Sequence, residues 1–199
     1  MIVNTVEQYI SSPFEVSLDL ALSATVLKRF EKLLTVRSRF YFTKISQIKK
    51  LVKTLIQEDV FQPFSFKTLK TFQKKAYMRD GDGLYISYGI FFKTRETVFL
   101  SVLCHELAHI WLSQREFYPQ LKILNKEYLD RFEKRQESAL TSPIEVYARI
   151  VSLHIINQLA LSIQHKKRKK KALSVIEIDN EKIEKLKKTF ENIEPKTDL

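Results

Sequence analysis

The residues best suited to chemistry are two histidines and a glutamate, His105, Glu106 and His109, within the pentapeptide HELAH. On a helix, side chains four residues apart lie on the same face, so the two imidazoles can bind one metal ion. Glu106 lies on the flank of that pair, where its carboxylate can contact a metal-bound water without being a ligand. Catalytic zinc lowers the pKa of such a water toward about 7, which makes Glu106 the expected general base.

This motif is rare enough by chance to support a functional interpretation. The chain has only four histidines, and chance would give this pattern roughly 0.006 times in a chain of this composition. The motif also interrupts an apolar stretch, where unpaired polar side chains are costly to bury. The alternative is a purely structural motif, in which both histidines bond to backbone carbonyls and Glu106 faces solvent.

A third ligand must come from elsewhere in the chain, because catalytic zinc usually has three protein ligands. Glu145 is the strongest candidate, since it stands between Ile144 and Val146, where a carboxylate requires a cation. A rival interpretation is a capping box formed by Ser142 and Glu145 at a helix start. His154 is a rival ligand, but it lies nine residues further on, about 180° round a helix from Glu145. Two imidazoles and one carboxylate suit zinc best among the divalent metals.

Four neighbouring residues have weaker claims to a chemical role. Tyr147 or Arg149 could stabilise an oxyanion, although Tyr147 lies two residues after Glu145 and points elsewhere on a helix. Cys104 is interpreted as a packed small residue rather than a ligand. Trp111 is expected in the core.

The patterns around the motif predict the elements that position it. Residues 98 to 112 are apolar nearly all round, which predicts a buried helix in the middle of the fold. Residues 64 to 93 contain aromatic and β-branched runs and a turn at residues 80 to 83, which predicts two or three strands. We expect residues 84 to 93 to form one of these strands.

The rest of the chain has helical patterns. Apolar spacing predicts two or three amphipathic helices in the first sixty residues. Further helices are expected from Pro119, from Pro143 to about residue 163, and over about 176 to 193. The predicted fold class is therefore α+β, mostly helical with a small sheet.

Residues 64 to 160 resemble the zincin metallopeptidases, whose active-site helix carries HExxH and lies beside a sheet edge. Glu145 and Ala148 match the Glu-x-x-Ala element of the gluzincin branch, which implies that Glu145 is the third zinc ligand. Small intracellular domains of the ImmA/IrrE type are similar. The resemblance also implies that residues 84 to 93 are the edge strand that flanks the motif helix, and that a peptide substrate pairs with this strand. The metzincin branch is excluded, because residues 112 to 115 provide no third histidine.

The length of 199 residues fits one zincin-like domain over residues 1 to 165, followed by a basic run and a C-terminal helix over 166 to 199. Within that domain, helices occupy residues 1 to 60, and the sheet and active-site helices occupy 61 to 165. One cysteine excludes an internal disulfide, and the start of the chain does not resemble a signal peptide, so we expect a cytoplasmic protein. No apolar run is long enough to span a membrane.

The formal net charge is +11, and residues 166 to 171 (KKRKKK) place six positive charges in a row. Such a run can attract nucleic acid or anionic lipid. No aromatic residue interleaves it as a base-stacking surface requires, so a nucleic-acid partner is weakly supported. We expect a solvated loop between two helices.

The leading hypothesis is a zinc-dependent metallopeptidase that hydrolyses peptide bonds in a peptide or protein substrate. Glu106 would be catalytic, and His105, His109 and Glu145 would bind Zn²⁺. One alternative is a zincin-like zinc-binding module that acts through a protein or DNA partner without catalysis. Another is a DNA-associated protease that uses the basic run. The natural substrate, the oxyanion-stabilising residue and the oligomeric state are left open by the sequence.

Overall fold

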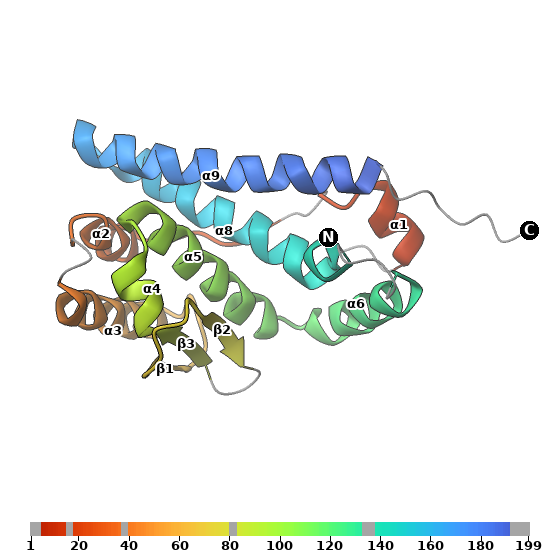
Figure 1. Cartoon of the computed structure of the whole chain (residues 1–199), viewed down its shortest axis with the longest axis horizontal. Helices are drawn as coiled ribbons and strands as arrows, with labels where there is room; N and C mark the ends of the chain where they lie inside the picture. The colour runs from red at the N-terminus through yellow and green to blue at the C-terminus, as the bar shows by residue number, and fades with distance from the viewer. Residues whose placement is uncertain (1–4, 15–17, 37–39, 80–82, 133–137, 192–199) are drawn as a thin grey trace, which may run out of the picture.

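The computed structural model describes residues 5–14, 18–36, 40–79, 83–132 and 138–191. These ranges are mostly helical with one small sheet, which confirms the α+β class. Figure 1 shows two helices crossing the middle of the molecule, α5 (Glu96–Ser113) and α8 (Pro143–Ser162). A third helix, α9 (Lys166–Glu191), runs along one side of both.

The N-terminal part forms three helices, as predicted: α1 (Val6–Ser11), α2 (Ala24–Leu33) and α3 (Tyr41–Gln57). The hydroxyls of Thr5 and Ser23 accept hydrogen bonds from the first turns of α1 and α2, which satisfies backbone N–H groups that have no partner within the helix. Helices α2 and α3 pack together, and α2 also contacts α8. Helices α2 and α3 are therefore scaffold at one end of the molecule, while α1 contacts α6 at the other end (Figure 1).

The sheet has three strands in the order β1-β3-β2, comprising β1 (Ser65–Leu69), β2 (Ala76–Arg79) and β3 (Gly83–Ser87). Strand β3 pairs in parallel with β1 and antiparallel with β2. A glycine is required where β3 begins, because Gly83 has φ +122° and a Cβ there would lie 2.1 Å from the carbonyl oxygen of Ser65. The predicted turn preceding it, residues 80–82, lies outside the described residues.

The prediction of one edge strand over residues 84 to 93 is wrong in two respects. The strand ends at Ser87, whose hydroxyl accepts a hydrogen bond from the N–H of Ile90 and caps the short helix α4 (Tyr88–Lys93). Strand β3 is also central and buried along its length, so the edge beside α5 belongs to β2. Aromatic residues after Ser87 favour a strand locally, but the cap begins a helix instead.

The C-terminal half contains α6 (Tyr118–Phe132), α7 (Ser138–Thr141), α8 and α9. The helices predicted from Pro119 and Pro143 are confirmed to within one residue. The solvated loop predicted for residues 166 to 171 is wrong, because these residues form the first turns of α9. Lys and Arg are good helix formers, and here their side chains remain mostly exposed while Arg168 pairs with Glu31 at 2.9 Å.

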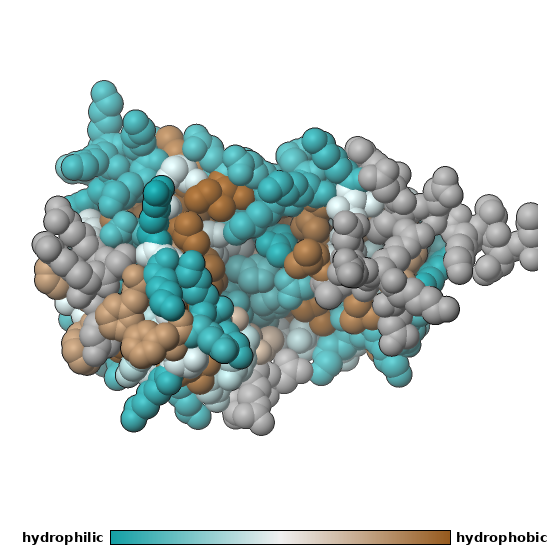
Figure 2. All heavy atoms as spheres, viewed as in Figure 1, coloured by the Kyte–Doolittle hydropathy of each residue, from teal (hydrophilic) through white to brown (hydrophobic). Residues whose placement is uncertain are grey.

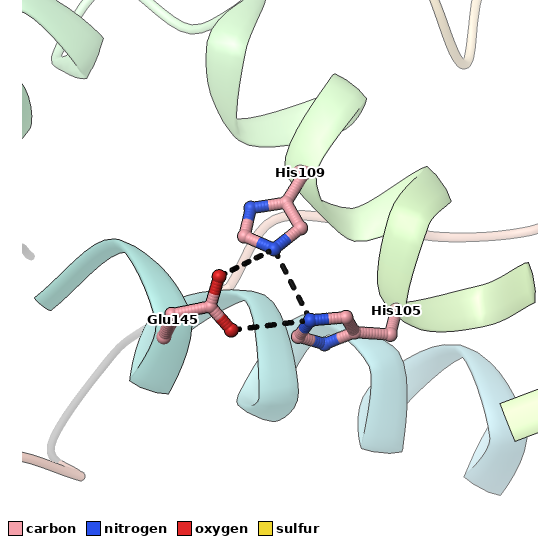
Figure 3. A group of neighbouring side chains, drawn as sticks. All are labelled: His105, His109 and Glu145. Atoms are coloured by element: carbon pink, nitrogen blue, oxygen red, sulfur yellow. Dashed lines mark hydrogen bonds and ion pairs between the residues drawn. The ribbon is translucent and has the colours of Figure 1, made fainter. Parts of the chain in front are cut away.

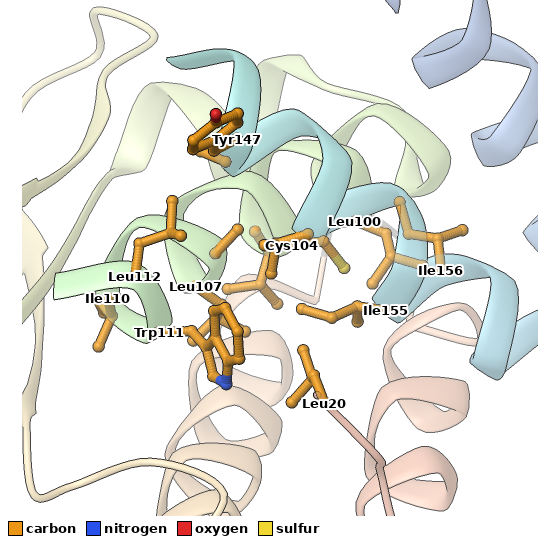
Figure 4. Close-up of a cluster of buried hydrophobic side chains, with 14 of the residues drawn as sticks. Leu20, Leu100, Cys104, Leu107, Ile110, Trp111, Leu112, Tyr147, Ile155 and Ile156 are labelled. Atoms are coloured by element: carbon orange, nitrogen blue, oxygen red, sulfur yellow. The ribbon is translucent and has the colours of Figure 1, made fainter. Parts of the chain in front are cut away.

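Helix α5 is apolar on nearly all sides because it is surrounded. It packs against α8, α9 and the sheet, and Figure 4 shows its side chains within the main hydrophobic cluster. Cys104, Trp111 and Tyr147 are all buried there, so the core positions expected for Cys104 and Trp111 are confirmed. Within the described ranges, no helix is both long and apolar enough to cross a membrane.

Candidate metal centre

Three side chains meet between α5 and α8. His105 and His109 project from α5 toward Glu145, which lies in the first turn of α8 (Figure 3). The two histidine Nε2 atoms are 3.1 Å apart. Glu145 presents Oε2 at 3.3 Å from Nε2 of His105, and Oε1 at 3.2 Å from Nε2 of His109. The helical spacing of the motif and the packing of α5 on α8 therefore bring the three predicted ligands together.

The spacing of these donor atoms leaves room for one metal ion among them. The two histidine nitrogens are 3.1 Å apart, and each lies 3.2 to 3.3 Å from a different oxygen of Glu145. One donor atom from each of the three residues lies within 4.8 Å of the others. In a tetrahedral centre with bonds of about 2.0 to 2.1 Å, neighbouring donor atoms lie roughly 3.3 Å apart, and three protein ligands leave a fourth position for water or substrate. The donor set therefore could hold a metal ion, and its two imidazoles and one carboxylate are ligand types that zinc accepts.

The protonation of these ligands also favours a cation. Burial lowers the pKa of His105, which keeps its imidazole neutral and able to offer a lone pair. Burial by itself would raise the pKa of Glu145, but hydrogen bonds with His105 and His109 hold that pKa well below its usual value. Glu145 is thus an ionised carboxylate beside two imidazoles, so the site carries negative charge for a cation to neutralise.

Glu106 lies next to the three candidate ligands but is not one of them. Its side chain is only 8% exposed, and burial raises its pKa to about 7, with the nearby carboxylate of Glu145 adding to the shift. A backbone hydrogen bond from Met78 on β2 acts in the opposite direction, as does the proximity of His109. A carboxyl group with a pKa near neutral is suited to accept and release a proton.

The rival assignments for the third ligand are not supported by the geometry. The Nε2–H of His154 donates to the backbone carbonyl of Leu20 at 2.8 Å, so this histidine links α8 to the segment before α2. Ser142 is the N-cap of α8 but makes no side-chain capping bond, so the capping box is wrong. Asn125 of α6 takes that role, since its Oδ1 accepts from the N–H of Ile144 at 3.0 Å.

The two oxyanion candidates have different surroundings. Tyr147 is fully buried and packs edge-on against Tyr9, with ring centroids 6.0 Å apart, so it lies in the core. Arg149 lies one turn after Glu145, and its Nη2 is 4.0 Å from Oε2 of that residue. Of these two, Arg149 is the residue that lines the cavity beside the metal ligands.

A cavity of about 450 Å³ opens directly beside His105 and Glu106. It lies between α5 and α9, where Figure 2 shows separate hydrophobic patches below the hydrophilic surface of α9. Its apolar lining includes Val102, Leu140 and Leu186, and its cations are Arg149, Lys182 and Lys185. No local pattern predicts that α9 forms a wall of this cavity, because α5 and α9 are far apart in the chain.

No family model, curated protein or solved structure matches the chain.

Proposed function

We propose that the protein is a zinc-dependent metallopeptidase of the zincin type, with His105, His109 and Glu145 as ligands and Glu106 as the catalytic base. The observation that carries this proposal is the convergence of three metal-binding donor atoms beside a buried carboxylate that is itself not a ligand. A purely structural site has no need for such a carboxylate next to an open cavity.

When bound, zinc polarises the scissile carbonyl and lowers the pKa of water at the site. Glu106 accepts a proton from the attacking water and passes it to the leaving amine. Its pKa of about 7 suits both transfers, because neither protonation state is strongly favoured near neutral pH. The hydrogen bond from Met78 and the packing around Glu106 hold its carboxylate in place.

Two features support a peptide substrate. Strand β2 is the sheet edge beside α5, and an extended peptide can add to such an edge through main-chain hydrogen bonds. The cavity beside Glu106 can receive a substrate side chain. The buried, unbridged Cys104 suits a reducing compartment, and we propose that the protein acts in the cytoplasm.

The test has two parts. Protein purified without added metal should contain about one zinc per chain by elemental analysis. Metal-loaded protein should cleave members of a mixed peptide library, and Glu106→Gln should bind zinc equally well while losing at least about 100-fold in cleavage rate. Zinc binding without cleavage in the unaltered protein would instead favour the non-catalytic zinc-binding module, and absence of zinc binding would overturn both functions.

A further inference from the structure

The imidazole of His105 has a second nitrogen, Nδ1, on the side of the ring away from Glu145. This atom is buried and has no hydrogen-bond partner among the described residues. A metal-binding histidine usually donates this N–H to another group, which fixes the ring orientation and leaves Nε2 free for the metal. The surroundings of Nδ1 therefore bear on how well His105 can act as a ligand.

A small void lies behind His105, lined also by Arg149, Ser152, Asp179 and Lys182. Three of these residues have a buried polar atom that lacks a partner within the described part of the chain: Nε of Arg149, Oγ of Ser152 and Oδ2 of Asp179. The void measures about 10 Å³, close to the space that one water molecule needs. The four residues that carry these unpartnered atoms, with His105 among them, thus line a space of molecular size.

The four atoms match the hydrogen-bonding capacity of one water. The N–H groups of His105 and Arg149 can donate to its oxygen, and the oxygens of Asp179 and Ser152 can accept its two protons. A buried water typically makes two to four such bonds to groups that would otherwise be unsatisfied. No protein atom among the described residues meets these needs, and leaving buried polar atoms unsatisfied is costly.

We propose that one buried water fills this void and connects Asp179 to His105, so that Asp179 of α9 is a positioning residue for the metal ligand. The inference rests on the proposed metal site. The water keeps the proton of His105 on Nδ1 and leaves the lone pair of Nε2 directed at the metal. The link runs through one water because Asp179 and His105 make no direct bond.

Asp179 is itself held firmly. Its Oδ1 accepts from the hydroxyl of Ser101 on α5 at 2.6 Å and from Nζ of Lys182 at 3.0 Å. Lys182 also contacts Oγ of Ser101 at 2.9 Å. These bonds use one carboxylate oxygen and leave the other, Oδ2, for the void. Helix α9 therefore contributes Asp179 to the surroundings of His105, on the side of the ring away from Glu145.

The test compares variants that disturb the water with one that disturbs only the docking of α9. Asp179→Asn can place an N–H where the water needs an acceptor, and Ser152→Val fills the void with methyl groups. Each should weaken zinc binding by about 10- to 100-fold in competition with a coloured chelator. Arg168→Gln removes an ion pair between α9 and Glu31 outside the void, so its zinc affinity should change less than about threefold.

A second measurement does not depend on metal. A high-resolution crystal structure of the metal-free protein should show one ordered water bonded to Nδ1 of His105 and Oδ2 of Asp179, and Ser152→Val should lack it. Unchanged zinc affinity in both Asp179→Asn and Ser152→Val would overturn the inference, as would an equal loss of affinity in Arg168→Gln or an empty void in the unaltered protein. If the unaltered protein binds no zinc, the proposed function fails while the crystal structure still decides whether a water connects Asp179 to His105.

Discussion

Met78 and Glu106 are joined by a hydrogen bond from the backbone of strand β2 to the carboxylate on helix α5. The edge of the sheet and the catalytic candidate are therefore in direct contact. A peptide that pairs with β2 would lie alongside Glu106 without any rearrangement of the fold.

Glu106 makes the stability of the metal-free protein depend on pH. Its pKa is raised from 4.5 to about 7 by burial, so the native state keeps the proton over a range where the unfolded state releases it. This contribution lowers stability as the pH rises from about 4.5 to about 7, by about 3 kcal/mol in total. Glu106→Gln cannot ionise, so urea unfolding should find it more stable than the unaltered protein at pH 8 and nearly equal at pH 4.5. Equal stability at both pH values would contradict the buried position of Glu106.

Glu145→Ala and His154→Ala should separate a metal ligand from a structural residue. Loss of Glu145 removes one of three donors and should weaken zinc binding by orders of magnitude. Loss of His154 removes its bond to the carbonyl of Leu20, which should cost about 1 to 2 kcal/mol of stability with or without metal. Calorimetric titration with zinc and thermal unfolding measure both effects. Normal zinc affinity in Glu145→Ala would exclude it as a ligand.

The cavity beside Glu106 should favour acidic substrates. Arg149, Lys182 and Lys185 are its cations, while Glu106 is the carboxylate in its lining. Peptides with Asp or Glu next to the scissile bond should therefore have a lower KM than matched Asn or Gln peptides, and salt should reduce the difference. Lys185→Gln should weaken the preference several-fold. Lys167→Gln serves as the control, because it makes the same charge change outside this lining. An equal effect in both variants would contradict a role of Lys185 within the cavity.

The basic start of α9 is electrostatically unfavourable for the helix. Lys166 and Lys167 lie at its N-terminus, where the helix dipole disfavours positive charge. Replacing both with Gln should leave stability unchanged or raise it by up to about 1 kcal/mol, measured by urea unfolding at low salt. A clear loss of stability would mean that the run is needed for packing.

The sequence predicts the parts of the site that depend on local spacing. His105 and His109 share a helix face because of their four-residue separation, and Glu145 was found through its apolar neighbours and the Glu-x-x-Ala pattern. Helix periodicity places α5 and α8 reliably for the same reason, since each is a long segment with a clear pattern.

The parts that depend on contacts distant in sequence were not predictable in this way. Strand order follows from pairing across the sheet. No local pattern therefore indicates that β3 is the central strand and that β2, rather than β3, is the edge strand. Asp179 appears in the sequence as one charge among many on an amphipathic helix, and only the packing of α9 on α5 brings it behind His105. Ser87 is an exception, because serine is a preferred N-cap residue and is thus a local sign that a helix can begin there.

The bond between Ser101 and Asp179 joins residues 78 positions apart. During synthesis on the ribosome, α5 and α8 emerge before α9, so a partly made chain holds its histidines and Glu145 before the wall that contains Asp179 exists. The cavity beside Glu106 is likewise incomplete until Lys182 and Leu186 have been added. Because of the order of translation, the complete site cannot assemble until α9 has left the ribosome.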